Sequence, residues 1–211
     1  MGQVVELTRR RKRTPNAVNG KVPPKRRANR KVRSREYLTP DEVVQLIALA
    51  GALGRHRGRD QTLLTLMYRH GLRVSEAVSL RWDQVDLKAG LFHVNRLKNG
   101  LPSTHPLRGP ELRKLRQLRR DYPDGPYLFV SERGGPMTAS NVRKLVARAG
   151  EAAKLGFPVH PHMFRHACGY KLANDGHDTR ALQHYLGHKN ISHTVRYTEM
   201  APDRFKAFWK D

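Results

Sequence analysis

The first 36 residues carry the most restrictive pattern in the chain, because they hold too little apolar surface to fold alone. Thirteen Lys and Arg residues stand against Glu6 and Glu36 there, so this stretch supplies +11 of the formal net charge of +23. Segments of high charge and low hydrophobicity bury too little apolar surface to offset the conformational entropy that the chain loses when it orders. The sequence therefore predicts a basic, disordered arm over 1–36 and a folded domain over 37–211.

The whole chain is strongly basic, with 41 Lys and Arg residues against 18 Asp and Glu. Such a charge attracts polyanions over long distances, so double-stranded DNA is the partner we expect. Arg26 and Arg27 of the arm would then neutralise phosphates, although a solubilising leader is the alternative for this segment. No apolar run approaches the roughly 18 residues that span a bilayer, and no signal-peptide core is present. We therefore expect no membrane partner and a cytoplasmic, nucleoid-associated location.

Apolar residues recur at helical spacing beyond residue 37 and predict a mainly α-helical fold. Thr39-Pro40-Asp41-Glu42 has the form of a capping box with proline at the first helical position. A helix should begin there and end at Gly51 or Gly54. Further helices are expected from Asp60, from a Ser75 cap, over 111–120, from a Ser140 cap and over 161–176, with shorter ones between 178 and 197.

The stretch 91–107 changes to an alternating pattern and predicts a β-hairpin, which makes the fold class α+β with a small antiparallel element. Asn99-Gly100 is typical of a tight two-residue turn and would put Lys98 at its tip. Pro102 and Pro106 cannot donate to a ladder, so the second strand should lie at an edge. An exposed turn lysine is usually solvated, and Lys98 alone indicates no chemistry.

The stretch 160–197 concentrates basic and nucleophilic side chains. A helix from Pro161 would project His162 and Arg165 from the same side, with Gly169 between them leaving space for a phosphate. His188 follows in a glycine-containing turn, and Tyr197 comes nine positions later. This combination of residue types points to chemistry on a phosphodiester.

Three other interpretations of this stretch stay open. His162 and His166 are four residues apart and could bind zinc together with His160 or His188. Residues 179–197 have the helix, turn and helix pattern of a protein that reads DNA without catalysis. Tyr197 could be an ordinary aromatic residue at the edge of the core.

Two further basic groups are ambiguous on their own. Arg73 stands just before a short helix, where free N–H groups and the helix dipole favour an anion, but it could equally pair with Glu76 at the surface. Arg143, Lys144 and Arg148 share the outer face of a later helix. That face could lie on DNA or simply be solvated.

In order and spacing, these groups resemble the tyrosine recombinase (phage integrase) family from residue 37 to the C-terminus. The matching motifs are Arg73-Val-Ser-Glu76, Lys98, His162-Met-Phe-Arg165-His166, Leu186-Gly187-His188 and Tyr197, with Gly71-Leu-Arg73 and Leu80–Asp86 agreeing around them. Only the short basic stretch precedes this region. In this respect the chain resembles the compact fimbrial-switch DNA invertases, which consist of little more than the catalytic domain.

The resemblance implies a site-specific recombinase or integrase that cleaves and rejoins DNA through a 3′-phosphotyrosyl intermediate, without metal, cofactor or ATP. The implied roles are Tyr197 as nucleophile, Arg73 and Arg165 on the phosphate oxygens, His162 as base or phosphate donor, His188 as a further donor, Lys98 as general acid and Glu76 as an orienting group. A type IB topoisomerase-like activity shares this chemistry and is an alternative. The resemblance also implies a tetramer on DNA formed from chains that are monomeric when free, with accessory DNA-bending proteins. Residues 203–211, an amphipathic segment, would dock on a neighbouring protomer or pack on their own domain.

Overall fold

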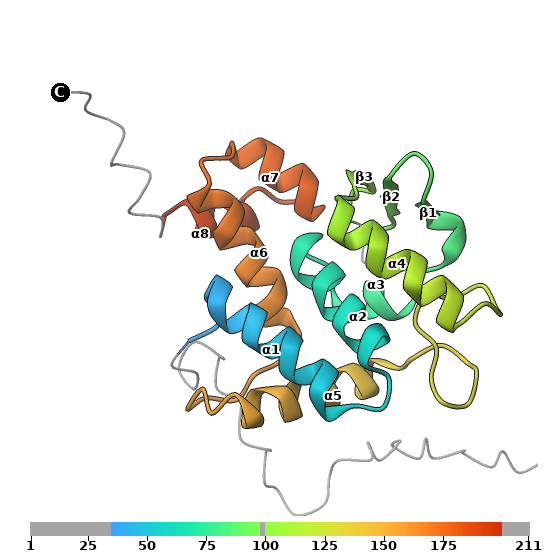
Figure 1. Cartoon of the computed structure of the whole chain (residues 1–211). Helices are drawn as coiled ribbons and strands as arrows, with labels where there is room; N and C mark the ends of the chain where they lie inside the picture. Colours follow the sequence, from blue (N-terminus) through green and yellow to red (C-terminus); the bar gives the residue numbers. More distant parts are fainter. Residues whose placement is uncertain (1–34, 98–99, 200–211) are drawn as a thin grey trace, which may run out of the picture. The chain divides into compact units, whose positions relative to one another are not determined.

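The computed structural model describes residues 35–97 and 100–199, which form a mainly helical domain with one small sheet (Figure 1). The helices are α1 (Pro40–Leu53), α2 (Arg57–Arg69), α3 (Val74–Val78), α4 (Gly109–Asp121), α5 (Ala139–Ala152), α6 (His162–Asn174), α7 (Thr179–Leu186) and α8 (Ser192–Glu199). A 3-10 helix, η2 (Trp82–Gln84), precedes three antiparallel strands, β1 (Val85–Asp86), β2 (Leu91–Val94) and β3 (Ser103–Pro106). The predicted α+β fold is confirmed. Lys98, Arg26, Arg27 and the 203–211 segment lie outside the described residues.

Local capping chemistry sets where α1 begins and ends. The Thr39 hydroxyl accepts the backbone N–H of Glu42, and the Glu42 carboxylate accepts the backbone N–H of Thr39. Gly54 follows the last helical residue. The predicted capping box and one of the two predicted ends are therefore confirmed.

Three predicted helix starts are wrong. Thr138 caps α5, because it and Asn141 each bond to the other's backbone, and Ser140 lies inside the helix. Ser75 also lies inside its helix: the Glu76 carboxylate accepts the backbone N–H of Arg73, which moves the start of α3 to Val74. Helix α2 begins at Arg57, three residues before Asp60.

The sheet differs from a simple hairpin with a tight turn. Pairing runs from Leu91 opposite Pro106 to Val94 opposite Ser103, so the whole segment 95–102 joins β2 to β3. A two-residue turn at Asn99-Gly100 would place Val94 opposite His105 instead of Ser103, so the register predicted from that turn is wrong, and Asn99 itself lies outside the described residues. Strand β3 is an edge strand, as its prolines predict.

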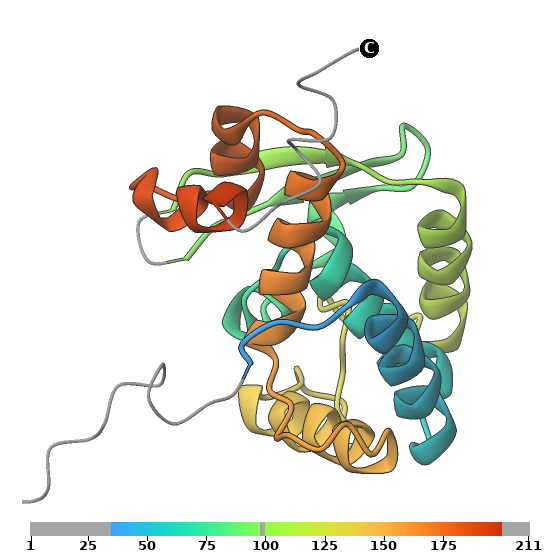
Figure 2. The ribbon, with the colours of Figure 1, turned by 90° about the vertical axis from the view of Figure 1, so that its left-hand side faces the viewer.

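Helix α6 links two hydrophobic cores. The larger core involves α1, α2, α4, α5 and the first half of α6, and the smaller one consists of Cys168, Ala173, Leu182, Leu186 and Tyr197. Figure 2 shows α6, in orange, passing from α5 to α7 and α8, and α6 also packs against α1 and α2. Side chains that α6 directs toward α7 and α8 are thus held by a helix anchored in the main core.

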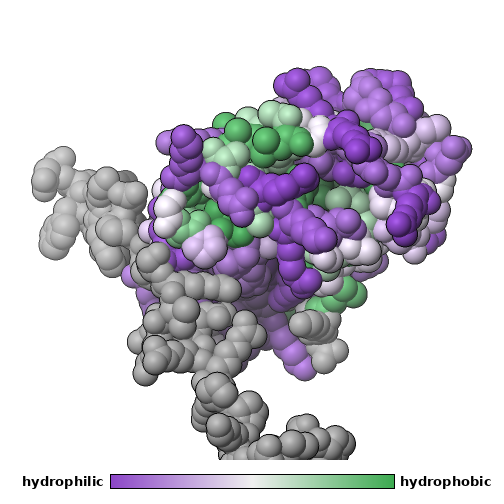
Figure 3. Space-filling view, turned by 90° about the horizontal axis from the view of Figure 1, so that it is seen from below, coloured by the Kyte–Doolittle hydropathy of each residue, from purple (hydrophilic) through white to green (hydrophobic). Residues whose placement is uncertain are grey.

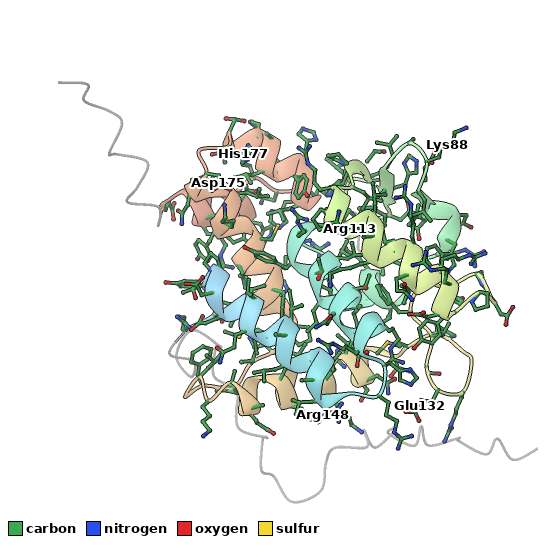
Figure 4. The ribbon with its side chains drawn as sticks, in the orientation of Figure 1. Lys88, Arg113, Glu132, Arg148, Asp175 and His177 are labelled. Carbon is green, nitrogen blue, oxygen red and sulfur yellow. The ribbon has the colours of Figure 1, made fainter. Side chains whose placement is uncertain are left out.

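The outer face of α5 is exposed and basic. Arg143, Lys144 and Arg148 are all exposed, and Figure 4 shows Arg148 at the outer edge of this helix. Polar and charged side chains cover much of the face seen in Figure 3, with smaller apolar patches between them. Contact of these residues with DNA stays a prediction. Within the described ranges, no helix has both the length and the hydropathy to cross a bilayer.

Candidate active site

A basic cleft of about 780 Å³ brings together side chains from distant parts of the chain. Its walls are formed by Arg73, Gly100, His162, Arg165, His166, Arg180, Gln183, Gly187, His188, Lys189, Asn190, Ile191, His193, Arg196 and Tyr197. Among the described residues, no carboxylate belongs to this lining. A cleft with cationic walls and no acidic ones favours an anionic ligand such as a phosphodiester.

Glu76 lies buried beneath the cleft among arginines. Its Oε1 accepts Arg73 Nη1 at 2.7 Å, and its Oε2 accepts Arg96 Nη1 at 3.1 Å and lies 4.0 Å from Arg165 Nη1. Burial alone would raise the pKa of Glu76, but the backbone N–H of Arg73 and the charges of Arg96 and Arg165 lower it overall. One carboxylate therefore faces three guanidinium groups, and the cluster keeps an excess of positive charge.

Arg165 is fixed by backbone carbonyls. Its Nη1 donates to the carbonyl of Gly71, and its Nη2 donates to the carbonyl of Leu186 at 2.6 Å. Burial, together with the charges of Arg73 and Arg96, lowers the pKa of Arg165 to about 10. The guanidinium is thus charged at neutral pH and held in one orientation at the cleft wall.

His188 and His162, two of the histidines that line the cleft, differ in their surroundings. His188 is buried, and its Nδ1 lies 2.8 Å from Thr194 Oγ1. Burial and the nearby charge of Arg165 lower the pKa of His188 to about 3, so it is neutral at pH 7. His162 is exposed at the start of α6, where desolvation by the protein around its ring and the charge of Arg165 lower its pKa to about 4.

Tyr197 lies on α8 and is only 2% exposed, although it lines the cleft. Its hydroxyl is 3.0 Å from Nδ1 of His166. Burial raises the pKa of Tyr197 to about 12 and lowers that of His166 to about 2. In this arrangement Tyr197 is both a member of the smaller core and a group at the cleft, so the two interpretations of its role are compatible.

Gly169 makes room for this tyrosine. A Cβ atom at Gly169 would lie 2.7–2.8 Å from three atoms of the Tyr197 ring. The prediction that Gly169 leaves space for a phosphate is therefore wrong, because the ring of Tyr197 fills that space.

The structure brings together Arg73, Glu76, His162, Arg165, His188 and Tyr197, as their types suggested. Lys98 lies outside the described residues, although Gly100 nearby lines the cleft. Sequence reasoning missed Arg96 and Thr194, and it named His166 as a possible zinc ligand and as part of the family motif but gave it no catalytic role. Within the described ranges, no three His, Cys, Asp or Glu side chains gather so that they could hold a metal ion.

Comparison with known proteins shows similarity over most of the chain. The model of the phage integrase family matches residues 36–204. The type 1 fimbriae regulatory protein FimB of Escherichia coli (strain K12) is 40% identical over 182 residues, which cover 84% of this chain and 90% of FimB. FimE of the same strain is 41% identical over 182 residues, covering 83% and 91%.

Solved structures show the same fold. The crystal structure of XerA recombinase matches with a TM-score of 0.70 at 25% identity, over 81% of this chain and 62% of that one. XerH bound to palindromic difH in a post-cleavage complex matches with a TM-score of 0.69 at 23% identity, over 81% of this chain and 51% of that one.

Proposed function

Because the chain belongs to the phage integrase family of tyrosine recombinases, we propose that Tyr197 is the nucleophile of its DNA strand exchange. The chain is a site-specific recombinase, as its motifs predict, and DNA is its partner. A DNA reader without catalysis is thereby excluded. Three points remain to be assigned: the role of each side chain in catalysis, the role of the basic arm and the assembly on DNA.

The observation that carries the assignment is the cleft in which Tyr197 shares a wall with Arg73, Arg165 and His188. In our proposal, Arg73 and Arg165 hold the non-bridging oxygens of the scissile phosphate, and His188 donates a further hydrogen bond. The pentacoordinate transition state carries one more negative charge than the diester. A preorganised donor to such a charge contributes on the order of 3 kcal/mol, which is roughly 100-fold in rate.

The covalent step begins with a protonated tyrosine. With a pKa of about 12, the phenolate is a fraction of about 10⁻⁵ at pH 7, so the proton must leave as the bond to phosphorus forms. We assign that proton to His162, which lines the cleft and contacts the ring of His166, the histidine beside the Tyr197 hydroxyl. Tyr197 Oη forms a bond to phosphorus, the bond from phosphorus to O5′ breaks, and Lys98 protonates the departing oxygen. Rejoining is the reverse of these steps.

We further propose that 37–211 is the catalytic domain and that the 1–36 arm holds DNA through its phosphates. The exposed basic face of α5 would lie on the same DNA. Four chains would assemble on DNA from free monomers, with accessory DNA-bending proteins, in the cytoplasm. These statements rest on charge and on the family, and each is separable from the chemistry at Tyr197.

A nicked suicide DNA tests the nucleophile. Covalent capture from randomised duplexes would supply the target, and the wild-type chain should then form a protein–DNA adduct that Tyr197→Phe does not form. Tyr127→Phe, a half-buried tyrosine outside the cleft, is the matched control and should form the adduct normally. An adduct in Tyr197→Phe, or none with the wild type on any captured DNA, would show that the assignment is wrong.

The general acid needs a separate test. A thiolate leaves without protonation far more readily than an alkoxide, so a 5′-bridging sulfur in the scissile bond removes the need for an acid. Lys98→Met should cleave the ordinary diester poorly and the sulfur-containing one at close to the wild-type rate. Equal loss on both substrates would assign Lys98 to another role.

A further inference from the structure

Arg96 joins three separate segments of the site through one buried guanidinium. Its Nη1 donates to Oε2 of Glu76 at 3.1 Å and to the carbonyl of Gly71 at 3.3 Å. Its Nη2 donates to the carbonyls of His70 at 3.0 Å and Tyr185 at 2.5 Å. The segments that carry Arg73 and His188 and the loop after β2 are therefore tied together at one point.

These acceptors also form the frame that orients Arg165. The carbonyl of Gly71 accepts from both Arg96 and Arg165, and Oε2 of Glu76 lies near both guanidinium groups. The carbonyl of Leu186, which Arg165 also uses, follows directly after Tyr185. Because the side chain of Arg96 has no exposed surface, it cannot touch DNA, and any effect on catalysis must pass through these neighbours.

Two glycines fit closely around the stem of Arg96. A Cβ at Gly187 would lie 2.5 Å from Cγ of Arg96, and a Cβ at Gly100 would lie 2.6 Å from Cβ of Arg96. Gly187 also has a positive φ of 66°. A Cβ at Gly100 would also lie 2.8 Å from the carbonyl oxygen of Gly187, so the backbone before His188 and the loop after β2 pack closely both on the arginine side chain and on each other.

The charge of the cluster matches the reaction proposed for it. Arg73, Arg96 and Arg165 face the single carboxylate of Glu76, so the group carries a net charge of about +2. A buried guanidinium without a full counter-charge destabilises the free protein. A pentacoordinate phosphate carries two negative charges and would neutralise the group.

We propose that Arg96 is a positioning residue for phosphate binding, which holds Arg73, Arg165 and the turn before His188 in the geometry that fits the transition state. This proposal rests on the proposed function, because it needs a phosphate in the cleft. It concerns the forked geometry of the guanidinium more than its charge. An ammonium group is a single point and cannot bridge acceptors that are divided between Nη1 and Nη2.

The test compares Arg96→Lys, which keeps the charge, with Arg59→Met as a matched control. Arg59 is also buried, and it bonds to Asp60 and to the carbonyl of Val130, away from the cleft. In single-turnover cleavage of the suicide DNA, Arg96→Lys should be slower than the wild type by about 100-fold, the loss typical of a small misplacement of reacting groups. Arg59→Met should lower the melting temperature and leave the cleavage rate within about threefold.

A methylphosphonate at the scissile position separates positioning of the arginines from general damage. Replacing one non-bridging oxygen by methyl removes the charge that Arg73 and Arg165 bind, so Arg96→Lys should lose much less on this substrate. The proposal would be overturned if Arg96→Lys cleaved the diester at the wild-type rate, or if its rate fell by the same factor on the two substrates.

A measurement that does not depend on cleavage separates the proposal for Arg96 from the assignment of Tyr197 as the nucleophile. In ¹⁵N-arginine-labelled protein, the Nε–H signals of Arg73 and Arg165 should shift in Arg96→Lys and stay in place in Arg59→Met. If the wild type formed no adduct, the assignment of Tyr197 would fail. The signals would then decide alone: displaced signals would support the positioning role of Arg96, and unchanged signals would refute it.

Discussion

Replacing Gly169 with alanine is expected to separate the stability of α6 from the position of Tyr197. Gly169 lies inside α6, where alanine is favoured over glycine by about 1 kcal/mol. The new Cβ would, however, lie 2.7–2.8 Å from three ring atoms of Tyr197. Non-bonded carbons prefer about 3.5–4.0 Å, so the ring must move by about 1 Å.

The two effects have opposite signs and can be measured separately. Overpacking a buried contact destabilises by about 1–3 kcal/mol, which exceeds the gain in helix propensity. We therefore expect Gly169→Ala to lower the free energy of unfolding by about 1 kcal/mol. In a Tyr197→Ala background the ring is absent, and the same change should raise it by about 1 kcal/mol.

Urea unfolding of the four chains in this cycle gives the coupling energy between the two positions. The moved ring should also slow single-turnover cleavage of the suicide DNA by about 100-fold, since a misplacement near 1 Å has that effect on reacting groups. The reasoning is refuted if Gly169→Ala stabilises both backgrounds equally, or if it cleaves as fast as the wild type.

Three further outcomes are expected from the site and the arm. Thr194→Val removes the partner of His188 Nδ1 and keeps a β-branched side chain of similar shape. Cleavage should fall about tenfold with at most about 1–2 kcal/mol lost in urea unfolding; an unchanged rate would mean that His188 needs no such support. The pKa values of His105, His166 and His188 are lowered to about 3, 2 and 3 in the folded chain. As the pH falls, these histidines therefore take up protons in the unfolded chain before they do so in the folded chain. Stability should therefore be constant above pH 6.5 and fall below it, by up to about 4 kcal/mol at pH 5.5, and a melting temperature that stays flat from pH 7.5 to 5 would contradict this. Deleting residues 1–34 should weaken DNA binding and make log K less steep in log salt, because each phosphate contact contributes about −0.9 to that slope; an unchanged slope in filter binding would exclude the arm from the complex.

Elements that depend on neighbouring residues were predictable from the sequence. The capping box at Thr39 and the apolar periodicity of α1, α4, α5 and α6 involve contacts within a few positions. The register of β2 against β3 was not predictable from the Asn-Gly pair, because it also depends on contacts of the two strands with the rest of the domain. Ser75 and Ser140 failed as caps because each helix begins before the serine, where Glu76 accepts the N–H of Arg73 and Thr138 accepts the N–H of Asn141.

The residues of the site divide in the same way. Arg73, Arg165, His188 and Tyr197 were found by residue type and order, which needs no knowledge of contacts. Arg96 was not found, because the groups it bonds to lie between 20 and 89 positions away. A buried arginine becomes recognisable only when the fold supplies its acceptors.

The charge balance of the free protein explains why the site should bind phosphate before it reacts. His188 and His166 are neutral at pH 7, so the fixed positive charge near Tyr197 comes from arginines, which pH does not remove. Because these guanidinium groups outnumber the single carboxylate of their cluster, that of Glu76, the folded chain holds unneutralised charge that a bound DNA phosphate would compensate. Phosphate binding should then stabilise this part of the fold, since a ligand that binds only the native state adds its binding energy to stability. Burial raises the pKa of Tyr197 and outweighs the charges of Arg165 and Arg196, which already act to lower it. If the ring left its buried place beside His166, exposure of the tyrosine and its activation should therefore occur in one step.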